Sequence, residues 1–567
     1  MGNQQGKSPH PSNGGGKKND QTSAVTSSSI TASTANKTNS ETKTKTAKDL
    51  QLHGAITMTE NTIDSNKDVY DYYEKVKHIN DGSTCEIWLV RRKKRHQHRM
   101  DKVTKEINSD STASSSDESP PPSTNTKPND TLYVMKVINK SKAQDGNDNG
   151  KDNLFLKEMK NEVSILRRLD HPNIVRIYDL FETQDSIYLI MEYCSGGDLL
   201  ARYPYKTEYE IAKLLTKVLS AVAYIHSIHV VHRDLKIENI IFENTLKSAE
   251  PKVIDFGLSK AYSKNKQRLK CKVGTLRTMS PQVLKGDYTS KADLWSVGVI
   301  AFKLLSGVYP FDEGESDRDL MKNIVKGEYK HKMETKEWKN VSKPAKDFVT
   351  SLLEYDPNKR KSATEALRSR WLVQSVVQHD PNSKKDSITV DGTMMDRIRT
   401  AIVQSSTKDN IFKKFVAMIV AHKSSNESLI ELRNAFHAID KNNHGTINYY
   451  EFKQALKQCN YSEQQLKSIF SGIDINHTGV INYTEFLAAT FTELRQVEEE
   501  LIVEAFDKID IDNTGYISKD NICSIMGSSL CSQSDCDAIV NDVLKELDQD
   551  GDGTFTLCTV QYVYHLI

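Results

Sequence analysis

The sequence predicts an α+β domain followed by an all-α domain, with a disordered tail in front of both. At 567 residues the chain has room for about three or four domains. Over residues 70–372, β-branched apolar runs alternate with helical periodicity, which indicates a mixed domain of strands and helices. Over residues 431–567 a helix–loop–helix unit repeats four times, which indicates a second domain built of helices.

The amino-terminal segment differs from the rest in composition. Residues 1–65 are mainly Ser, Thr, Asn, Gly and Lys, with few aromatic residues. Such a segment buries too little apolar surface to offset its ordering entropy, so we expect it to be disordered. Residues 1–50 hold seven lysines and three acidic residues, which makes the tail mildly basic.

The charge balance and the cysteine usage of the whole chain narrow the class of protein to which it can belong. Lys and Arg number 77 and Asp and Glu 76, so net charge favours neither nucleic acid nor a membrane surface. Eight scattered cysteines without a C-x-x-C pair are typical of reduced thiols in an intracellular protein. The most apolar stretch, residues 294–305, contains Lys303 and is too short for a bilayer span, so it predicts a buried helix. We expect a soluble, cytoplasmic protein with no nucleic-acid partner and no signal peptide.

The chain also contains two polar inserts and one segment that joins the two domains. The inserts, residues 91–130 and 141–153, interrupt the α+β domain. The first begins with the basic run RRKKRHQHR, which fits a nuclear address or, as we favour, a solvated loop. Residues 373–430 join the two domains, and their apolar residues recur at helical spacing. We therefore expect an amphipathic helical junction there.

The four repeats each contain a twelve-residue loop. The first two loops, 440–451 and 474–485, place oxygen-bearing side chains at positions 1 and 3, glycine at 6, an apolar residue at 8 and glutamate at 12. Calcium takes about six to eight oxygen ligands, which such a loop supplies if glycine permits the turn and glutamate binds with both oxygens. The apolar residue at position 8 lets paired loops join through a short strand. One such loop could be a simple Asx-turn between helices, but four in series indicate EF-hands that bind calcium.

The last two loops, 510–521 and 548–559, lack the closing glutamate. They end in Asn521 and Thr559, neither of which gives bidentate charged coordination, so their occupancy stays open. His444, at position 5 of the first loop, is an unusual ligand and suggests a weaker first site. The candidate calcium ligands are Asp440, Asn442, His444, Thr446 and Glu451; Asp474, Asn476, Thr478, Val480 and Glu485; Asp510, Asp512, Thr514 and Tyr516; and Asp548, Asp550, Asp552 and Thr554.

Four sequence motifs of the α+β domain occur in an order that is informative about function. The strand TLYVMKVI carries Lys136, and the helical pattern after it carries Glu162. The segments VVHRDLKIENIIF and PKVIDFGLSK follow, with Asp234 in the first and Asp255 in the second. Any one of these residues could be an ordinary surface or capping group. Together, in this order, they form the protein-kinase signature set.

Phosphoryl transfer explains each residue type. Because ATP is polyanionic, Lys136, steadied by Glu162, holds its α- and β-phosphates. Asn239 and Asp255 supply oxygen ligands that place Mg²⁺ on the phosphates. Asp234 accepts or orients the proton of the substrate hydroxyl, and Lys236 neutralises charge on the moving phosphoryl group. The catalytic set is thus Asp234, Lys236, Asn239 and Asp255.

The chain resembles the calcium-dependent protein kinases of plants and protists, and we expect an apicomplexan member. The resemblance covers about residues 70–567 and implies a bilobal protein kinase fold, an autoinhibitory junction at 373–430 and a calmodulin-like domain of four EF-hands. LIMEYCSGGDLL resembles the family's hinge, which implies Met191 as gatekeeper and the Glu192–Cys194 backbone as the adenine contact. SKADLWSVGVI resembles the helix whose aspartate, Asp293, braces the catalytic loop.

The loop INDGSTCEIWLV, residues 79–90, departs from the family pattern. Taken alone it is a hairpin of turn-forming residues between two apolar strands. The family has three glycines where this chain has Asn80, Gly82 and Cys85. Because Asn tolerates unusual backbone angles, the resemblance implies a working but sub-optimal nucleotide loop. The candidate ATP-binding residues of this loop are Ile79, Asn80, Gly82 and Ile87.

Two further departures lie in the second half of the kinase region. The A-P-E motif reads Ser280-Pro281-Gln282, so its usual ion pair, here with Arg360, is expected to become a neutral contact. Ile237 replaces proline in the D-L-K-P-E-N motif, which we interpret as a packing change.

Two functions from different classes fit these features. The first is a serine/threonine kinase activated by calcium, and the second is a calcium-sensing scaffold with a weakened kinase fold, suggested by Asn80, Cys85 and Gln282. Retention of the catalytic set favours the enzyme, because a scaffold has no physical need for it. Asp198 and Glu238 match family positions whose carboxylates face the residues before the acceptor hydroxyl, so the resemblance implies basic residues there in substrates. Asp198 could equally cap a helix, and Glu238 could merely lie beside the catalytic loop.

The amino terminus carries a possible lipid site. MGNQQGK begins with Met-Gly, so removal of Met1 would expose Gly2 for N-myristoylation, although Gly6 stands where the motif prefers Ser or Thr. One myristoyl chain, helped by nearby lysines, gives only weak membrane association.

Overall fold

The computed structural model describes most of the chain from residue 68 onward. The described residues are 68–81, 85–93, 131–140, 161–205, 207–263, 268–311, 314, 316–378, 392–407, 411–494, 497–530, 540–541, 543–545, 547–548 and 551–565. Residues 50–567 form one compact unit. The predictions for the tail with Gly2, for most of both inserts, for Gly82 and for Asp550 lie outside the described residues.

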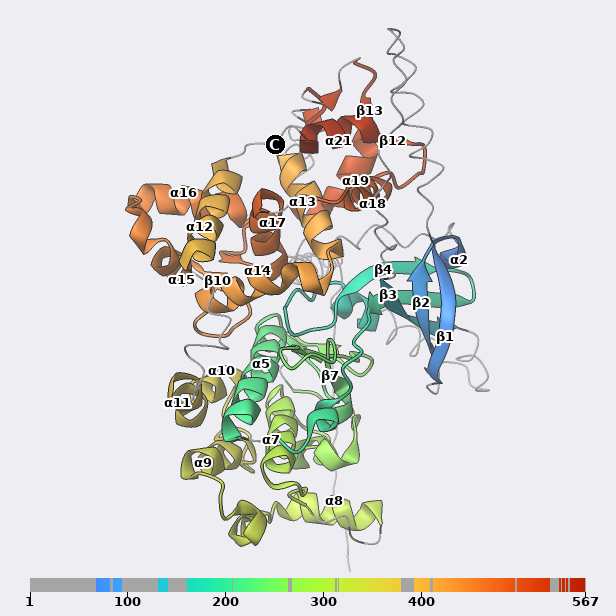
Figure 1. The fold of residues 1–567 in the computed structure, drawn as a ribbon. Coiled ribbons are helices and arrows are strands. Elements are labelled where there is room, and N and C mark those ends of the chain that lie inside the picture. The colour runs from blue at the N-terminus through green and yellow to red at the C-terminus, as the bar shows by residue number, and fades with distance from the viewer. Residues whose placement is uncertain are drawn as a thin grey trace, which may run out of the picture. The chain divides into compact units, whose positions relative to one another are not determined.

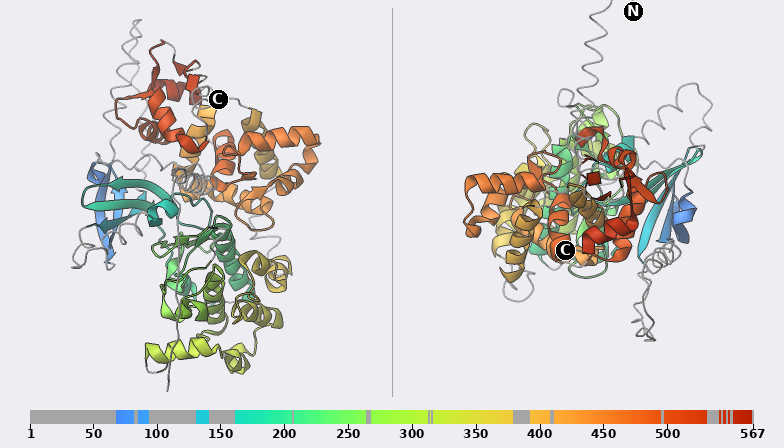
Figure 2. Two further views of the ribbon diagram at one scale, coloured as in Figure 1. Left: turned by 180° about the vertical axis from the view of Figure 1, so that it is seen from behind. Right: turned by 90° about the horizontal axis from the view of Figure 1, so that it is seen from above.

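A five-stranded antiparallel sheet forms the first part of the kinase region (Figure 1). Its strand order is β1-β2-β3-β5-β4, and the strands lie side by side in both views of Figure 2. The strands are β1 Tyr73–Asp81, β2 Cys85–Arg92, β3 Leu132–Asn139, β4 Ile177–Glu182 and β5 Ser186–Glu192, and the short helix α2 Val69–Tyr72 precedes them. An aromatic and aliphatic cluster that includes Tyr73, Met135 and Phe181 is buried against this sheet. Strand β3 is central, so the register places Lys136 between Ile87 of β2 and Leu189 of β5.

The rest of the kinase region is mainly helical. Its helices are α5 Glu208–Ser227, α6 Pro281–Lys285, α7 Lys291–Ser306, α8 Asp317–Lys326, α9 Lys343–Leu352, α10 Ala363–Leu367 and α11 Arg370–Gln378. Short 3₁₀ turns η2 Leu199–Arg202, η3 Ile237–Asn239, η4 Leu276–Thr278, η5 Lys330–Glu334 and η6 Lys336–Trp338 lie between them. Helix α7 contains the apolar stretch 294–305, and most of its residues are buried, as predicted.

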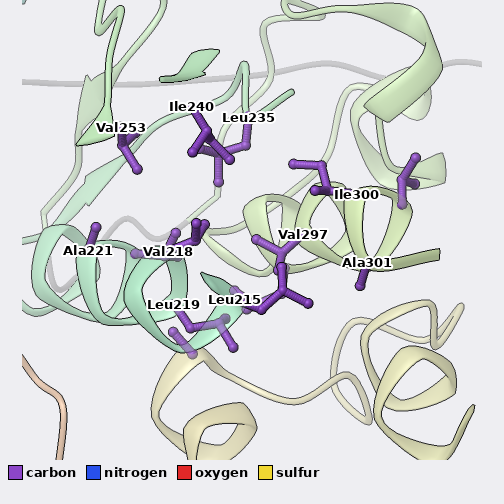
Figure 3. Packing of buried hydrophobic residues seen from close by; sticks show 14 of the residues in the cluster. Leu215, Val218, Leu219, Ala221, Leu235, Ile240, Val253, Val297, Ile300 and Ala301 are labelled. Carbon is purple, nitrogen blue, oxygen red and sulfur yellow. The ribbon is translucent and has the colours of Figure 1, made fainter. Parts of the chain in front are cut away.

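Helices α5 and α7 hold the core on which the catalytic segments rest. Leu215 and Val218 of α5 face Val297 and Ile300 of α7 in one continuous cluster (Figure 3). The same cluster takes in Leu235 from the catalytic loop. The short strand pairs β6 Val230–Val231 with β9 Lys260–Ala261, and β7 Ile240–Phe242 with β8 Pro251–Val253, frame the catalytic residues. The polar catalytic loop is therefore anchored at both ends by buried apolar residues.

The carboxyl-terminal region is built from helices joined by the predicted loops. Two junction helices, α12 Gly392–Thr407 and α13 Ile411–Lys423, come first. The helices that flank the loops are α14 Asn426–Ile439, α15 Tyr449–Ala455, α16 Glu463–Ile473, α17 Tyr483–Leu494, α18 Glu499–Ile509, α19 Lys519–Leu530 and α21 Leu557–His565, with the 3₁₀ turn η7 Lys457–Cys459. This arrangement confirms the predicted fold class for the described residues.

The calcium loops pair through short strands, as their sequence predicts. Strands β10 Ile447–Asn448 and β11 Val480–Ile481 pair antiparallel, as do β12 Tyr516–Ser518 and β13 Thr554–Thr556. The apolar residues at loop position 8 lie opposite each other, Ile447 against Ile481 and Ile517 against Phe555. Each pair of loops thus shares one hydrophobic bridge.

None of the helices in the described part of the chain combines the length and the apolar character that crossing a bilayer requires.

Candidate active site and calcium loops

Lys136 and Glu162 form the ion pair expected of an assembled nucleotide site. The Lys136 Nζ lies 2.7 Å from Glu162 Oε1 and 3.6 Å from Asp255 Oδ1. Burial lowers the pKa of Lys136, but the attraction of Glu162 and Asp255 outweighs it and the pKa ends well above its usual value. The lysine is therefore charged and already positioned to meet a polyphosphate.

The carboxylate of Asp234 is held by neighbours on both oxygens. Its Oδ1 accepts hydrogen bonds from Thr275 N at 2.8 Å and Thr275 Oγ1 at 2.7 Å. Its Oδ2 lies 2.9 Å from Lys236 Nζ and accepts from Asn239 Nδ2 at 3.2 Å. Burial raises the pKa of Asp234, but the bonds from Thr275 and Lys236 outweigh burial, and the net shift is downward. Asp234 is an ionised acceptor in a fixed orientation.

The catalytic loop is braced from α7, as predicted for Asp293. The two oxygens of Asp293 accept from the backbone N–H groups of His232 and Arg233, each at 2.9 Å. His226 Nε2 lies 2.8 Å from Asp293 Oδ2. Arg233 and Asp255 both have positive φ angles, of 71° and 59°. The brace and these two backbone positions fix where the loop and the D-F-G segment point.

The predicted hinge lies at the end of β5. Met191 is half-buried and packs on the main core, while the side chain of Glu192 is buried. Glu192 Oε1 lies 3.0 Å from Lys252 Nζ. Burial raises the pKa of Glu192, but Lys252 and Arg176 outweigh it and lower the pKa to about 2. The thiol of Cys194 is half-buried beside this group, and partial burial together with the charge of Glu192 raises its pKa.

The loop that lacks two glycines joins β1 and β2. The pair is antiparallel with two register shifts, and Asn80 lies opposite Ile87. Ile79 is 47% exposed. Cys85 begins β2, lies opposite Ile138 and adds to the negative surroundings that raise the pKa of Lys136. Strands β1 and β2 thus form an antiparallel pair, and the thiol at the third glycine position lies near Lys136.

The two carboxylates assigned to the substrate differ in their surroundings. Asp198 caps η2, because its Oδ1 accepts from Leu200 N at 2.9 Å and Ala201 N at 3.2 Å. The capping alternative therefore holds, while Oδ2 makes no hydrogen bond within the described residues. Glu238 is exposed on η3, two residues after Lys236.

The predicted neutral contact at the A-P-E position is present. Arg360 Nη2 donates to Gln282 Oε1 at 2.9 Å, and Gln282 Nε2 donates to Tyr355 O at 2.6 Å. Arg360 is 1% exposed, and burial lowers its pKa to about 10. Gln282 thus replaces the usual carboxylate: its side-chain oxygen accepts from Arg360, and its amide nitrogen donates to the Tyr355 carbonyl.

All four calcium loops share one internal hydrogen bond. The carboxylate at position 1 accepts from the backbone N–H of the glycine at position 6, at 2.8 or 2.9 Å in every loop. These glycines have positive φ angles between 78° and 87°, which side chains rarely adopt. The sequence therefore folds all four loops into the same turn, whatever stands at position 12.

Position 12 separates the first two loops from the third. Glu451 Oε1 accepts from Asn442 N at 3.1 Å, and Glu485 Oε1 accepts from Asn476 N at 3.2 Å, so both reach across their loops to position 3. Asn521 Oδ1 instead accepts from Ser518 N at 2.9 Å. Asn521 N in turn donates to Ser518 Oγ, so these bonds stay within its own turn. Because Asn521 brings no charge to position 12 and bonds Ser518 instead, the third loop is less suited to a cation than the first two.

Loop 4 lacks a carboxylate at position 12 as well. Thr559 Oγ1 lies 3.4 Å from Thr556 Oγ1 at the end of β13. In the first loop, the buried Nε2 of His444 has no hydrogen-bond partner in the described residues, while His444 N donates to Asp440 Oδ1.

Among the described residues no three His, Cys, Asp or Glu side chains converge as a metal group, because these loops draw on Asn, Thr and carbonyl oxygens too.

The two junction helices pack against the EF-hand helices. Helix α12 contacts α16 and α17, and α13 contacts α17 and α18. Ile398 and Ile402 of α12 are buried there. Arg399 Nε donates to Ala455 O at 2.8 Å, and Lys414 Nζ donates to Gly472 O at 3.0 Å. The junction thus packs against helices of the first three EF-hands.

Several residues that sequence reasoning missed connect the EF-hand helices with the kinase region. Arg433 of α14 makes two hydrogen bonds to Glu243, at 2.7 and 2.9 Å, and both side chains are buried. Asn426 Nδ2 donates to Glu192 Oε1 at 2.6 Å, next to the hinge. Lys423 Nζ lies 2.8 Å from Asp179 Oδ2 on β4. Nothing in the local sequence marks these partners, which are far apart along the chain.

Two domain families match the chain. The protein kinase domain matches residues 123–372, and the EF-hand domain pair matches residues 430–491. The second match covers the first two loops.

Curated relatives are similar over most of their length. Calcium-dependent protein kinase 5 of Plasmodium falciparum is 28% identical over 424 residues, which is 74% of this chain and 71% of the relative. Calcium-dependent protein kinase 3 of Plasmodium berghei is 32% identical over 426 residues, 74% of this chain and 73% of the relative. Calcium-dependent protein kinase SK5 of Glycine max is 36% identical over 399 residues, 69% of this chain and 74% of the relative.

Proposed function

Since the chain belongs to the calcium-dependent protein kinase family, whose members are calcium-activated serine/threonine kinases, we propose how its residues divide the work. The observation that carries the proposal is the assembled constellation of Lys136 with Glu162 at 2.7 Å and of Asp234 with Thr275 at 2.7 Å. Asp234 takes the proton of a serine or threonine hydroxyl as that oxygen attacks the γ-phosphorus of ATP. The bond from phosphorus to the β,γ-bridging oxygen breaks, and ADP leaves.

The residues also fit Mg²⁺ as the cofactor. The Asp255 carboxylate is about half exposed toward solvent. Asn239 uses its amide nitrogen to bond Asp234, which leaves its carbonyl oxygen to serve a cation. When bound, Mg²⁺ neutralises charge on the phosphates and orients them. Asp255 and Asn239 would hold it, while Lys136 orients the nucleotide from the other side.

Calcium acts through the junction in this proposal. Without calcium, the 385–425 segment occludes the kinase cleft. Calcium in the first two loops then exposes an apolar surface that captures the segment. The packing of α12 against α16 and α17 supports the captured arrangement. The glutamates that cross loops 1 and 2 support calcium occupancy there rather than in loops 3 and 4.

The test is transfer of γ-phosphate to a peptide with arginines two and three residues before the serine, measured with calcium and with chelator. Calcium-dependent transfer is expected. Absence of transfer in both conditions would favour the alternative, a calcium-sensing scaffold. The peptide reflects our proposal that Glu238, and the free oxygen of Asp198, favour basic residues before the acceptor. Replacement of those arginines by alanine is the matched control.

We further propose that Gly2 is N-myristoylated and gives the otherwise cytoplasmic kinase a weak hold on membranes. Lys7, Lys17 and Lys18 add modest attraction to anionic lipids. Partitioning of the intact protein and of Gly2→Ala between cytosol and membranes tests this. Equal partitioning of the two would rule out the anchor.

A further inference from the structure

The activation segment, which we define as the stretch between Phe256 and Gly286, has charged side chains of positive sign only. Between Phe256 and Gly286 the chain contains no Asp or Glu, although its total charges nearly balance. The same stretch contains eight cations: Lys260, Lys264, Lys266, Arg268, Lys270, Lys272, Arg277 and Lys285. A solvated run of like charge needs no function, so the position of these residues must carry the argument.

The end of this segment is pinned to the catalytic loop. Thr275 bonds Asp234 through both its N–H and its hydroxyl. A Cβ on Gly274 would lie 2.5 Å from Arg233 O, which shows how closely the two backbones approach. Leu269 pairs with Tyr288, and Tyr288 Oη donates to Cys271 O at 2.8 Å. The cations between these anchor points therefore lie on fixed backbone within a few residues of the acceptor site.

Their charge is little compensated in the part of the chain that the structure describes. Arg268 forms an ion pair with Asp287, and both side chains are exposed. Lys270 and Lys272 are exposed, and their ammonium groups form no ion pair with a described residue. The stem of Lys272 lies along Gly286, where a built Cβ would be 3.4 Å from its Cε. Several like charges on one surface attract an anionic partner more than any one of them does.

We propose that Arg268, Lys270 and Lys272 form a cationic strip that selects protein substrates with acidic or phosphorylated side chains after the acceptor residue. The proposal rests on the kinase activity proposed above. An extended peptide advances about 3.3 Å per residue, so residues two to four places from the acceptor reach beyond Thr275. Asp198 and Glu238 favour basic residues on the preceding side. Charge complementarity therefore places the acidic side chains on the following side, along the strip.

Phosphorylated residues should be the strongest partners. A phosphoserine carries nearly two negative charges and three acceptor oxygens, whereas a carboxylate carries one charge and two. Substrates phosphorylated by another kinase would then be preferred over their unmodified forms. The reaction class that supplies such substrates is ATP-dependent phosphorylation of a serine or threonine a few residues after the acceptor.

The test uses the intact protein at saturating calcium and peptides that share one acceptor and its preceding arginines. The three residues at positions +2 to +4 are alanine, glutamate or phosphoserine. Two or three exposed ion pairs predict a kcat/KM about tenfold higher for the glutamate peptide than for the alanine peptide. The gain should lie mainly in KM, be larger for phosphoserine and shrink at high salt because exposed charges are screened.

A charge reversal separates this role from a structural one. The double variant Lys270→Glu with Lys272→Glu should lose the preference for glutamate and favour a peptide with lysine at +2 to +4. Lys343→Glu is the matched control, because Lys343 is an exposed lysine at the start of α9, which packs on α7 and α11. It should keep the preference unchanged.

The outcomes distinguish this proposal from the function on which it rests. Equal kcat/KM for all peptides in an active enzyme would overturn the strip and leave the kinase function intact. Transfer to none of the peptides would count against the proposed function itself. A double variant that still prefers glutamate would also overturn the strip.

Discussion

The guanidinium of Arg360 donates to the side-chain carbonyl of Gln282 at 2.9 Å, so this buried cation has a neutral partner. The amide of the same glutamine donates to Tyr355 O, a bond that a carboxylate could not make. The surroundings have therefore adapted to the amide.

This adaptation gives the first prediction. Gln282→Glu gains a charged bond to Arg360 but places a carboxylate oxygen against the Tyr355 carbonyl, so the unfolding free energy should change by less than about 1 kcal/mol. Gln282→Ala removes one hydrogen-bond partner from Arg360 and one from Tyr355 O. It should therefore lower the free energy of unfolding by about 1–3 kcal/mol. Chemical denaturation of the three proteins measures both changes. If Gln282→Glu instead stabilised the protein strongly, the contact with Tyr355 O would have no effect on stability.

The second prediction concerns the acid limb of the pH–rate profile. Bonds from Thr275 and Lys236 lower the pKa of Asp234 against the effect of burial, so the carboxylate remains ionised as pH falls toward the ordinary aspartate range. Thr275→Val removes the hydroxyl bond, which should raise that pKa and move the acid limb of kcat to higher pH. Profiles of kcat between about pH 3 and 7 cover the ordinary aspartate range in which this shift falls. Coincident limbs for both proteins would show that another group controls the profile.

The third prediction concerns the junction. A chain that ends after Gln378, at the end of α11, lacks the junction and the EF-hands, so it should transfer phosphate without calcium. Its rate should be below that of the calcium-saturated protein, because it loses contacts such as Arg433 with Glu243. Kinase assays with calcium and with chelator compare the two proteins. A truncated chain with no activity would mean that those contacts matter more than removal of the inhibitory segment.

The fourth prediction ranks the calcium loops. Glu485→Gln removes one of the glutamates that cross their loops and should raise the calcium concentration for half-activation strongly. Asp510→Ala acts on the third loop, where the uncharged Asn521 already stands in place of the closing glutamate, and should have little effect. Calcium titrations of kinase activity test both variants. An equal response of the two would contradict the ranking.

The sequence predicted those parts of the site that local chemistry specifies. Lys136 with Glu162, Asp293 with the catalytic loop and the facing residues at loop position 8 were all foreseeable, because each role demands one residue type at one spacing. Strand ends were less predictable. The apolar strand expected before the turn residues of the 79–90 loop extends over Tyr73–Asp81, because backbone pairing continues past the apolar side chains.

Contacts between distant segments could not be predicted. Arg433 and Glu243 are 190 residues apart, and each looks like an ordinary surface charge in its own segment. Helical periodicity shows that a face is apolar but not which surface covers it. The role of Asp198 was left open for a related reason, since capping and substrate binding require the same residue type.

The bond from Asn426 to Glu192 joins the EF-hand region to the side chain of a residue whose backbone is expected to meet adenine. Equilibrium coupling between two binding sites is reciprocal: whatever factor ATP applies to calcium affinity, calcium must apply to ATP affinity. We therefore expect the calcium threshold to depend on the ATP concentration as well as on the loops. Paired titrations, of calcium at several ATP concentrations and of ATP at several calcium concentrations, should give one common factor.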